Sequence, residues 1–90
     1  MRFRYDAEVD AAYLSLVDRD LRPGEAAQQS DLIATPGGAG SVILDFDAEG
    51  RLLGVEVLAA RAVLSAELFA AHPDSPDRSG ATGAGAPDSV

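Results

Sequence analysis

Two apolar stretches near the middle of the chain alternate with polar residues at a spacing of two. Within each stretch the positions on one side are all apolar: Val42, Leu44 and Phe46 in the first, and Leu53, Val55 and Val57 in the second. A period of two is typical of half-buried β-strands. Between the stretches lies Asp47-Ala-Glu-Gly50, whose glycine suits the left-handed position that closes a type I hairpin turn. The sequence therefore predicts a β-hairpin over residues 42–58, with the core of the sheet at this hairpin.

The N-terminal part of the chain shows the same period. Phe3 and Tyr5 alternate with arginines over residues 2–5, and a second apolar alternation covers residues 12–17. Both segments read as strands, and a helical turn or tight loop is expected between them at residues 6–10. Adjacent strands would allow Tyr5 and Tyr13 to pair.

Residues 25–41 have a mixed pattern. Ala26–Gln29 has helical propensity, whereas Leu32–Pro36 looks like a strand that ends at a proline. We favour an extended segment that pairs in the sheet. The stretch Pro36-Gly-Gly-Ala-Gly40 is then a flexible loop between strands.

The period of the apolar positions changes after Leu58. Residues 59–71 are rich in helix formers, and Pro73 ends the pattern. The apolar stripe of this predicted helix consists of Ala60, Val63, Leu64, Leu68 and Ala71. Phe69 lies at the edge of the stripe, where it can reach the core or a second subunit. The predicted fold class is α+β: a small antiparallel, meander-like sheet of four to five strands with one C-terminal helix packed on a face.

Composition separates the chain into two parts. Residues 73–90 are almost entirely Pro, Asp, Ser, Gly, Ala and Thr, so we expect a disordered C-terminal tail after a single domain of residues 1–72. A domain of this size buries little apolar surface, and the chain has no cysteine to form disulfides. Oligomerisation is the remaining way to hide apolar surface.

The charge balance is acidic, with seven basic against fifteen acidic residues and a net charge of −8. This argues against nucleic acid as a partner, because binding it requires neutralisation of phosphates. An acidic surface suits a basic protein or a divalent cation. The N-terminus lacks an apolar signal sequence, and no apolar run approaches the length of a membrane span, so we expect a cytoplasmic protein without a membrane partner.

Two acidic clusters are the candidates for metal chemistry. The first is Asp6, Glu8 and Asp10, and the second is Asp45, Asp47 and Glu49. Carboxylates bind Mg²⁺ or Ca²⁺, but the spacing fits no known calcium loop, and Asp fills cap and turn positions routinely. We therefore assign no metal site and keep Asp6, Asp10, Asp45 and Asp47 as weak candidates.

Groups for other chemistry are sparse. His72 is the sole histidine and sits beside Pro73 at the end of the predicted helix. No histidine lies near Ser15, Ser30, Ser41 or Ser65 in sequence, and residues 37–40 lack the Lys-Ser/Thr of a phosphate loop. We assign no catalytic residue and no cofactor, and a non-enzyme is the favoured interpretation.

Nine positions between Tyr5 and Glu56 carry a family resemblance. They are Tyr5, Asp6, Asp10, Tyr13, Asp45, Asp47, Gly50, Gly54 and Glu56. In this pattern the chain resembles the DUF2283 family of small bacterial and archaeal proteins over about residues 1–60. The stretch Leu32–Gly40 departs from it as an apparent insertion. The resemblance implies an α+β fold and no known activity.

Two classes of function remain. The first is a non-catalytic protein–protein interaction or oligomerisation module, either a homo-oligomer or the partner of a small basic protein such as a toxin. The second is a small-ligand or divalent-metal-binding protein or enzyme that uses the acidic clusters around Asp10 and Asp47. We favour the first.

Overall fold

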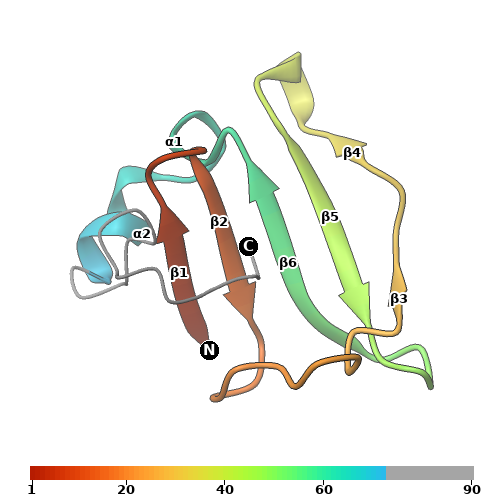
Figure 1. The fold of residues 1–90 in the computed structure, drawn as a ribbon. Helices are drawn as coiled ribbons and strands as arrows, with labels where there is room; N and C mark the ends of the chain where they lie inside the picture. The colour runs from red at the N-terminus through yellow and green to blue at the C-terminus, as the bar shows by residue number, and fades with distance from the viewer. Residues whose placement is uncertain (73–90) are drawn as a thin grey trace.

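The computed structural model describes residues 1–72, which form an antiparallel sheet with two short helices on one of its faces (Figure 1). The strands are β1 (Arg2–Asp6), β2 (Ala11–Ser15), β3 (Gln28–Gln29), β4 (Ile33–Ala34), β5 (Ser41–Phe46) and β6 (Leu52–Leu58). Their order across the sheet is β1-β2-β6-β5-β3, and β4 pairs with β5 as well. The antiparallel sheet expected from the sequence is confirmed. The tail predicted for residues 73–90 lies outside the described residues.

The central hairpin of β5 and β6 agrees with its sequence pattern. Val42 pairs with Val57 and Leu44 with Val55, so the apolar positions of both strands share one face. The backbone N–H of Gly50 donates to the Asp47 carbonyl at 3.0 Å, and Gly50 has a φ of 84°. That is the left-handed glycine that the predicted turn requires. A register shift next to Phe46 is the one irregularity within this pair of strands.

The N-terminal hairpin pairs β1 with β2 in a register that separates the two tyrosines. Tyr5 lies opposite Ala12, and Tyr13 lies opposite Arg4. Residues opposite each other share a face, so Tyr5 and Tyr13 point to different faces of the sheet. The predicted pairing of Tyr5 with Tyr13 is therefore wrong. A register that differs by one residue from the expected one reverses the face of every side chain.

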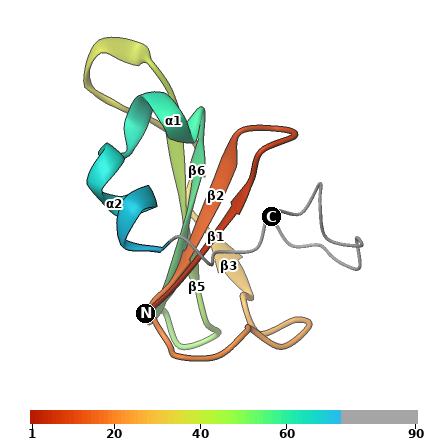
Figure 2. The same ribbon diagram turned by 90° about the vertical axis from the view of Figure 1, so that its left-hand side faces the viewer.

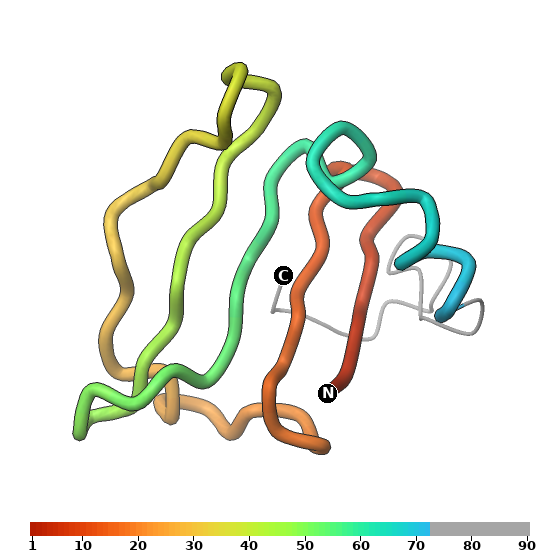
Figure 3. The backbone as a smooth tube through the Cα atoms, turned by 180° about the vertical axis from the view of Figure 1, so that it is seen from behind, coloured from red at the N-terminus to blue at the C-terminus, as the bar shows by residue number. Residues whose placement is uncertain are grey.

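The long connection after β2 carries the chain to the far edge of the sheet, so the topology is not a simple meander. There the chain runs extended along β5, first as β3 and then as β4 (Figure 3). The extended, sheet-paired interpretation of residues 25–34 is confirmed at Gln28–Gln29 and at Ile33–Ala34, whereas Glu25 belongs to the turn before β3. Pro36–Gly38 forms a short 3-10 helix before β5 begins. β6 then returns between β2 and β5 and joins the two hairpins.

Two helices follow β6 where the sequence predicted one: α1 (Ala60–Val63) and α2 (Ala66–Ala71). The break falls at Leu64 and Ser65, which are both extended. The Ser65 hydroxyl accepts from the backbone N–H of Glu67 at 3.0 Å and caps α2. A serine whose side chain accepts a hydrogen bond from the backbone is more favourable at the N-cap of a helix than in the interior of one. Within residues 1–72 no helix is long and apolar enough to cross a membrane.

The core lies between the helices and the β1–β2–β6 part of the sheet (Figure 2). Phe3, Ala12, Val57 and Ala60 are its buried centre. Phe69 packs edge-to-face on the ring of Phe3, with ring centroids 5.5 Å apart, and therefore belongs to the core. Of the predicted stripe, Ala60, Val63, Leu64 and Leu68 contribute to this core, whereas Ala71 is exposed.

Candidate functional site

The two faces of the sheet differ in chemistry. The strand register places every charged strand residue on the face opposite the helices, namely Arg2, Arg4, Asp6, Asp45 and Glu56. We call this the polar face and the other the helix-side face. The polar face carries Tyr13 as well, because Tyr13 pairs with both Arg4 and Glu56.

A buried carboxylate lies at the centre of the polar face. The Tyr13 hydroxyl donates to Asp45 Oδ2 at 2.9 Å, and Gln29 Nε2 donates to Asp45 Oδ1 at 2.9 Å. Asp45 is only 7% exposed, so these two bonds replace the water that it loses. They connect β2, β5 and β3, although β6 separates β2 from β5.

Gly54 provides the space for this connection. It lies in β6 between Ser15 of β2 and Asp45 of β5. A Cβ atom at Gly54 would stand 2.3 Å from Tyr13 Oη and 2.6 Å from Tyr13 Cζ. Tyr13 can therefore reach Asp45 only because residue 54 has no side chain.

The protonation of this cluster follows from its burial. Burial raises the pKa of Tyr13, and the hydrogen bond to Asp45 raises it further. The phenol therefore stays protonated, and its O–H group donates the hydrogen bond to Asp45. Burial is also the main cause of the raised pKa of Glu56, with a smaller contribution from the negative charge of Asp45. A phenol held in its protonated form is a hydrogen-bond donor to the carboxylate and a poor general base.

A second tyrosine–aspartate pair fixes the start of α1. Tyr5 Oη donates to Asp10 Oδ1 at 2.8 Å, and the backbone N–H of Arg61 donates to the same oxygen at 3.0 Å. The Asp10 carbonyl accepts from the N–H of Ala60 at 2.9 Å. The residue at the N-cap of α1, Ala59, has no side chain that can cap. Asp10 supplies the cap from the turn between β1 and β2.

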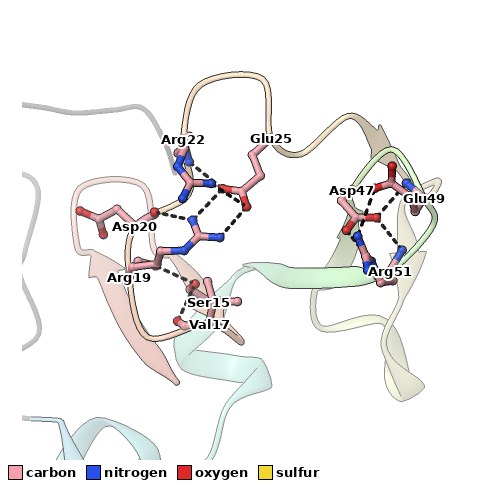
Figure 4. Close-up of polar contacts among 9 residues, drawn as sticks. All are labelled: Ser15, Val17, Arg19, Asp20, Arg22, Glu25, Asp47, Glu49 and Arg51. Atoms are coloured by element: carbon pink, nitrogen blue, oxygen red, sulfur yellow. Dashed lines mark hydrogen bonds and ion pairs between the residues drawn. The ribbon is translucent and has the colours of Figure 1, made fainter.

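Asp47 is engaged within its own turn (Figure 4). Its Oδ1 accepts from the backbone N–H groups of Glu49 and Arg51, each at 2.9 Å, and its Oδ2 accepts from Arg51 Nε at 2.9 Å. These donors, with the Arg51 backbone first, lower the pKa of Asp47. The carboxylate is a turn-stabilising group.

Sequence reasoning missed an ion pair in the loop after β2, which it took for a simple polar connection. Arg19 donates to both oxygens of Glu25, at 2.8 and 2.6 Å, in the bidentate arrangement that favours arginine (Figure 4). This contact is the main cause that lowers the pKa of Glu25 to about 2. Ser15 Oγ lies beneath the loop and donates to the carbonyl of Val17. The Arg-Pro-Gly-Glu turn at residues 22–25 was the available signal.

The four weak metal candidates are not brought together. Asp10 lies at the end of the sheet where β6 finishes, and Asp47 lies in the turn that precedes β6. Asp6 accepts from the N–H of Glu8, and Asp45 is held by Tyr13 and Gln29. Among residues 1–72 no group of three or more His, Cys, Asp or Glu side chains could hold a metal ion.

The helix-side face is covered over only part of its width. In Figure 1 α2 lies beside β1 and α1 lies at the end of β2 and β6. Val63 of α1 reaches Gly40 at the start of β5, and neither helix covers the rest of β5 or β4. Ile33 is 44% exposed and Leu52 is 41% exposed, while Leu44 and Phe46 are half-buried outside the main core. We call Ile33, Leu44, Phe46 and Leu52 the open apolar face. Unpartnered apolar surface of this kind is typical of interaction sites.

Comparison with known proteins gives one match. A family described as "Protein of unknown function (DUF2283)" matches residues 2–61. The chain belongs to this family. No curated protein and no solved structure matches it.

Eight of the nine DUF2283-pattern positions have a structural role that the contacts explain. Tyr5 and Asp10 hold α1, while Tyr13, Asp45 and Gly54 form the link across β6. Asp47 and Gly50 form the turn of the central hairpin, and Asp6 bonds the turn after β1. Glu56 lies on the polar face beside Tyr13. In this DUF2283 chain the pattern therefore describes the construction of the fold.

Proposed function

We propose that this DUF2283 protein is a non-catalytic protein–protein interaction and oligomerisation module. The open apolar face carries the proposal, because an exposed apolar surface on a small sheet is stabilised when a second protein covers it. Ile33 and Leu52 contribute its exposed parts, and Leu44 lies between the exposed part and the core. The surface belongs to the sheet, so it is presented without rearrangement.

The engagement of the carboxylates supports binding over chemistry. Asp10, Asp45 and Asp47 each accept hydrogen bonds from at least two donors of the chain itself. A general base needs a carboxylate or imidazole that is free to take a proton from a substrate. The residues that sequence reasoning singled out are instead used to hold strands, a turn and a helix in place.

The experiment that tests this function has two arms, self-association and partner binding. In the first, sedimentation velocity of the complete chain is measured over a wide range of concentrations. In the second, proteins crosslinked to the chain in its native host are identified, purified and titrated against it. The proposal expects self-association or a directly bound partner, and expects Leu44→Gln to weaken it.

Ile43→Gln is the matched control for this experiment. Ile43 is the neighbour of Leu44 in β5, is also half-buried and points to the polar face. It should therefore leave association unchanged. A chain that stays monomeric at every concentration, and binds no purified protein from the second arm, contradicts the proposed function.

A further inference from the structure

We propose that residues 28–34, which we call the edge strap, open away from β5 as one unit while the rest of the sheet stays folded. The edge strap contains β3 and β4 and forms the outer edge of the sheet beside β5 (Figure 3). Its opening uncovers the edge of β5 and separates Gln29 from Asp45. The proposed function does not require this motion, because the open apolar face is already present while the strap is closed.

The edge strap contributes no buried residue to the fold. Ser30 is half-buried and the other six residues are exposed, including Leu32 at 59% and Ile33 at 44%. None of them belongs to the core cluster or packs against it. Segments with few buried apolar contacts and with hydrogen bonds near solvent open at a lower free energy than the whole protein. The edge strap can therefore detach while the core stays intact.

The pairing of the edge strap with β5 is irregular at its centre. The Ser30 N–H donates to the Leu44 carbonyl at 2.8 Å, but the Leu44 N–H donates to the Ser30 hydroxyl at 2.9 Å. Three residue steps separate Ser30 from Ile33, whereas two separate their partners Leu44 and Val42. The extra residue is a bulge, which interrupts the ladder of hydrogen bonds. β5 is therefore paired by two separate strands of two residues each, and not by one continuous strand.

Contacts on either side of the edge strap hold its two ends. On the N-terminal side, Glu25 accepts from both terminal nitrogens of Arg19 and from the backbone N–H of Arg22. On the C-terminal side, the Thr35 N–H donates to the Gly40 carbonyl at 3.0 Å, and the Gly40 N–H donates to Thr35 Oγ1 at 3.2 Å. Gly40 packs so closely against the end of β6 that a Cβ atom would clash there. These contacts lie outside residues 28–34 and confine the motion to the strap.

The edge strap is long enough to move between these ends. Gln28 lies opposite Phe46 and Ala34 lies opposite Ser41, so six residue steps of the strap cover five steps of β5. Five strand steps span about 17 Å, and six extended steps can reach about 21 Å. The difference allows the middle of the strap to bow outward and break its hydrogen bonds to β5 without displacing the ends.

The backbone amides of β5 fall into two sets that distinguish strap opening from unfolding. The Leu44 N–H faces the strap, and by the alternation of an antiparallel ladder the Val42 N–H faces it as well. Ile43 and Asp45 direct their N–H groups toward β6 instead. Opening of the strap therefore frees the first set, whereas the second set is freed only when β5 and β6 separate.

Amide hydrogen exchange of the unmodified complete chain, followed by NMR, tests the opening. After correction for intrinsic rates, Ser30, Val42 and Leu44 should share one free energy of opening and exchange at least about tenfold faster than Ile43 and Asp45. Low concentrations of urea should accelerate exchange at Ile43 and Asp45 more steeply, because strap opening exposes less surface than unfolding of the sheet.

Two substitutions separate the two motions further. Gln29→Ala removes a hydrogen bond that only the closed form makes, so it should speed exchange at Leu44 and at Ile43 by similar factors. Phe69→Leu weakens the packing on Phe3, which stays in place when the strap opens. It should therefore speed exchange at Ile43 and leave Leu44 unchanged.

Equal protection of Leu44 and Ile43 in the unmodified chain would overturn the inference. An equal effect of Phe69→Leu on both amides would do the same, because both would then exchange through global unfolding. Fast exchange at Leu44 beside slow exchange at Val42 would also overturn it, since rotation of the Ser30 hydroxyl alone explains that pattern. Each of these results leaves the proposed function standing, because association through the open apolar face is measured separately.

Discussion

Tyr13 and Asp45 are hydrogen-bonded at 2.9 Å although a whole strand, β6, lies between the strands that carry them. The phenol crosses β6 over Gly54 and reaches a carboxylate that Gln29 holds from the other side. One side chain thus ties together strands that are not neighbours. We expect the stability of the fold to depend on this hydrogen bond. Substitutions at Gly54 and at Tyr13 test this separately.

Substitution of Gly54 by alanine should destabilise the protein. The new Cβ would stand 2.3 Å from Tyr13 Oη, which a well-packed site cannot accept without a shift of the ring. We expect a loss of about 1–3 kcal/mol in the free energy of unfolding, measured by urea denaturation. The same substitution in a Tyr13→Leu background should cost less, and the cost that remains comes from the Leu14 carbonyl oxygen, which lies 2.8 Å from the new Cβ. An equal cost in both backgrounds would show that the ring is not what Gly54 accommodates.

Removal of the Tyr13 hydroxyl should also destabilise the fold. Tyr13→Phe leaves Asp45 with one donor, Gln29, in a site where the carboxylate is nearly inaccessible to water. Loss of a partner to a buried charged group costs about 1–3 kcal/mol. A double-mutant cycle with Asp45→Asn measures the coupling between the two residues by urea denaturation. Independent, additive effects would contradict the proposed link.

Asp10→Ala should loosen α1 without unfolding the sheet. The substitution removes the acceptor for the Arg61 N–H and for Tyr5 Oη, and caps of this kind contribute about 1 kcal/mol. Amide exchange of Arg61 should become faster than that of residues in β5. Asp20→Ala is the control, because Asp20 is an exposed residue whose carboxylate forms ion pairs with Arg2 and Arg4, far from α1 in sequence. Equal exchange at Arg61 in both variants would rule out the capping role.

Glu25 and Glu56 should affect the pH dependence of stability in opposite directions. The pKa of Glu25 is lowered from 4.5 to about 2, so its contribution is present above pH 4.5 and is lost as the pH falls toward 2. The pKa of Glu56 is raised, so its protonated form favours folding, and stability is lost as the pH rises through 4.5 and above. Glu25→Gln should therefore reduce the acid sensitivity of unfolding, while Glu56→Gln should raise stability at neutral pH.

Urea denaturation of both variants between pH 2 and pH 8 measures these slopes. Asp47 and Asp18, whose pKa values are also lowered, contribute to acid sensitivity in every variant, so the comparison with the unmodified chain isolates each glutamate. Parallel pH profiles for all three proteins would show that neither carboxyl changes its pKa on folding.

The parts of the fold that could be predicted are those set by local chemistry. The alternation of Val42 and Leu44, together with the glycine at position 50, was enough for the central hairpin. The start of α2 was also readable, because Ser65 precedes Glu67 by two residues, but helix propensity hid it. The faces of Tyr5 and Tyr13 were not readable, since they depend on a register that the turn between the strands decides.

The candidate site could not be predicted, because it is formed by contacts between residues that lie far apart in the sequence. Tyr13 and Asp45 are thirty-two positions apart, and their contact requires β6 to lie between β2 and β5. The acidic residues were recognised as unusual, but their donors were not, because those donors come from other strands and from backbone groups. The open apolar face was invisible for a related reason. The alternation of β5 predicts which of its residues are removed from solvent. That part of this face has no helix over it follows from the short length of the two helices.

The place of β6 in the sheet also determines when the protein can fold during synthesis. Of the strands in residues 1–72, β6 is the last to leave the ribosome, and it alone joins the N-terminal hairpin to β5. Until Leu58 has emerged, β2 cannot pair with β6. Without β6 between β2 and β5, Tyr13 and Asp45 are not held at hydrogen-bonding distance. A nascent chain that stops before β6 therefore carries two incomplete pieces of sheet. We therefore expect the sheet to form in one late step, when β6 inserts between the β1–β2 hairpin and β5, which are synthesised earlier.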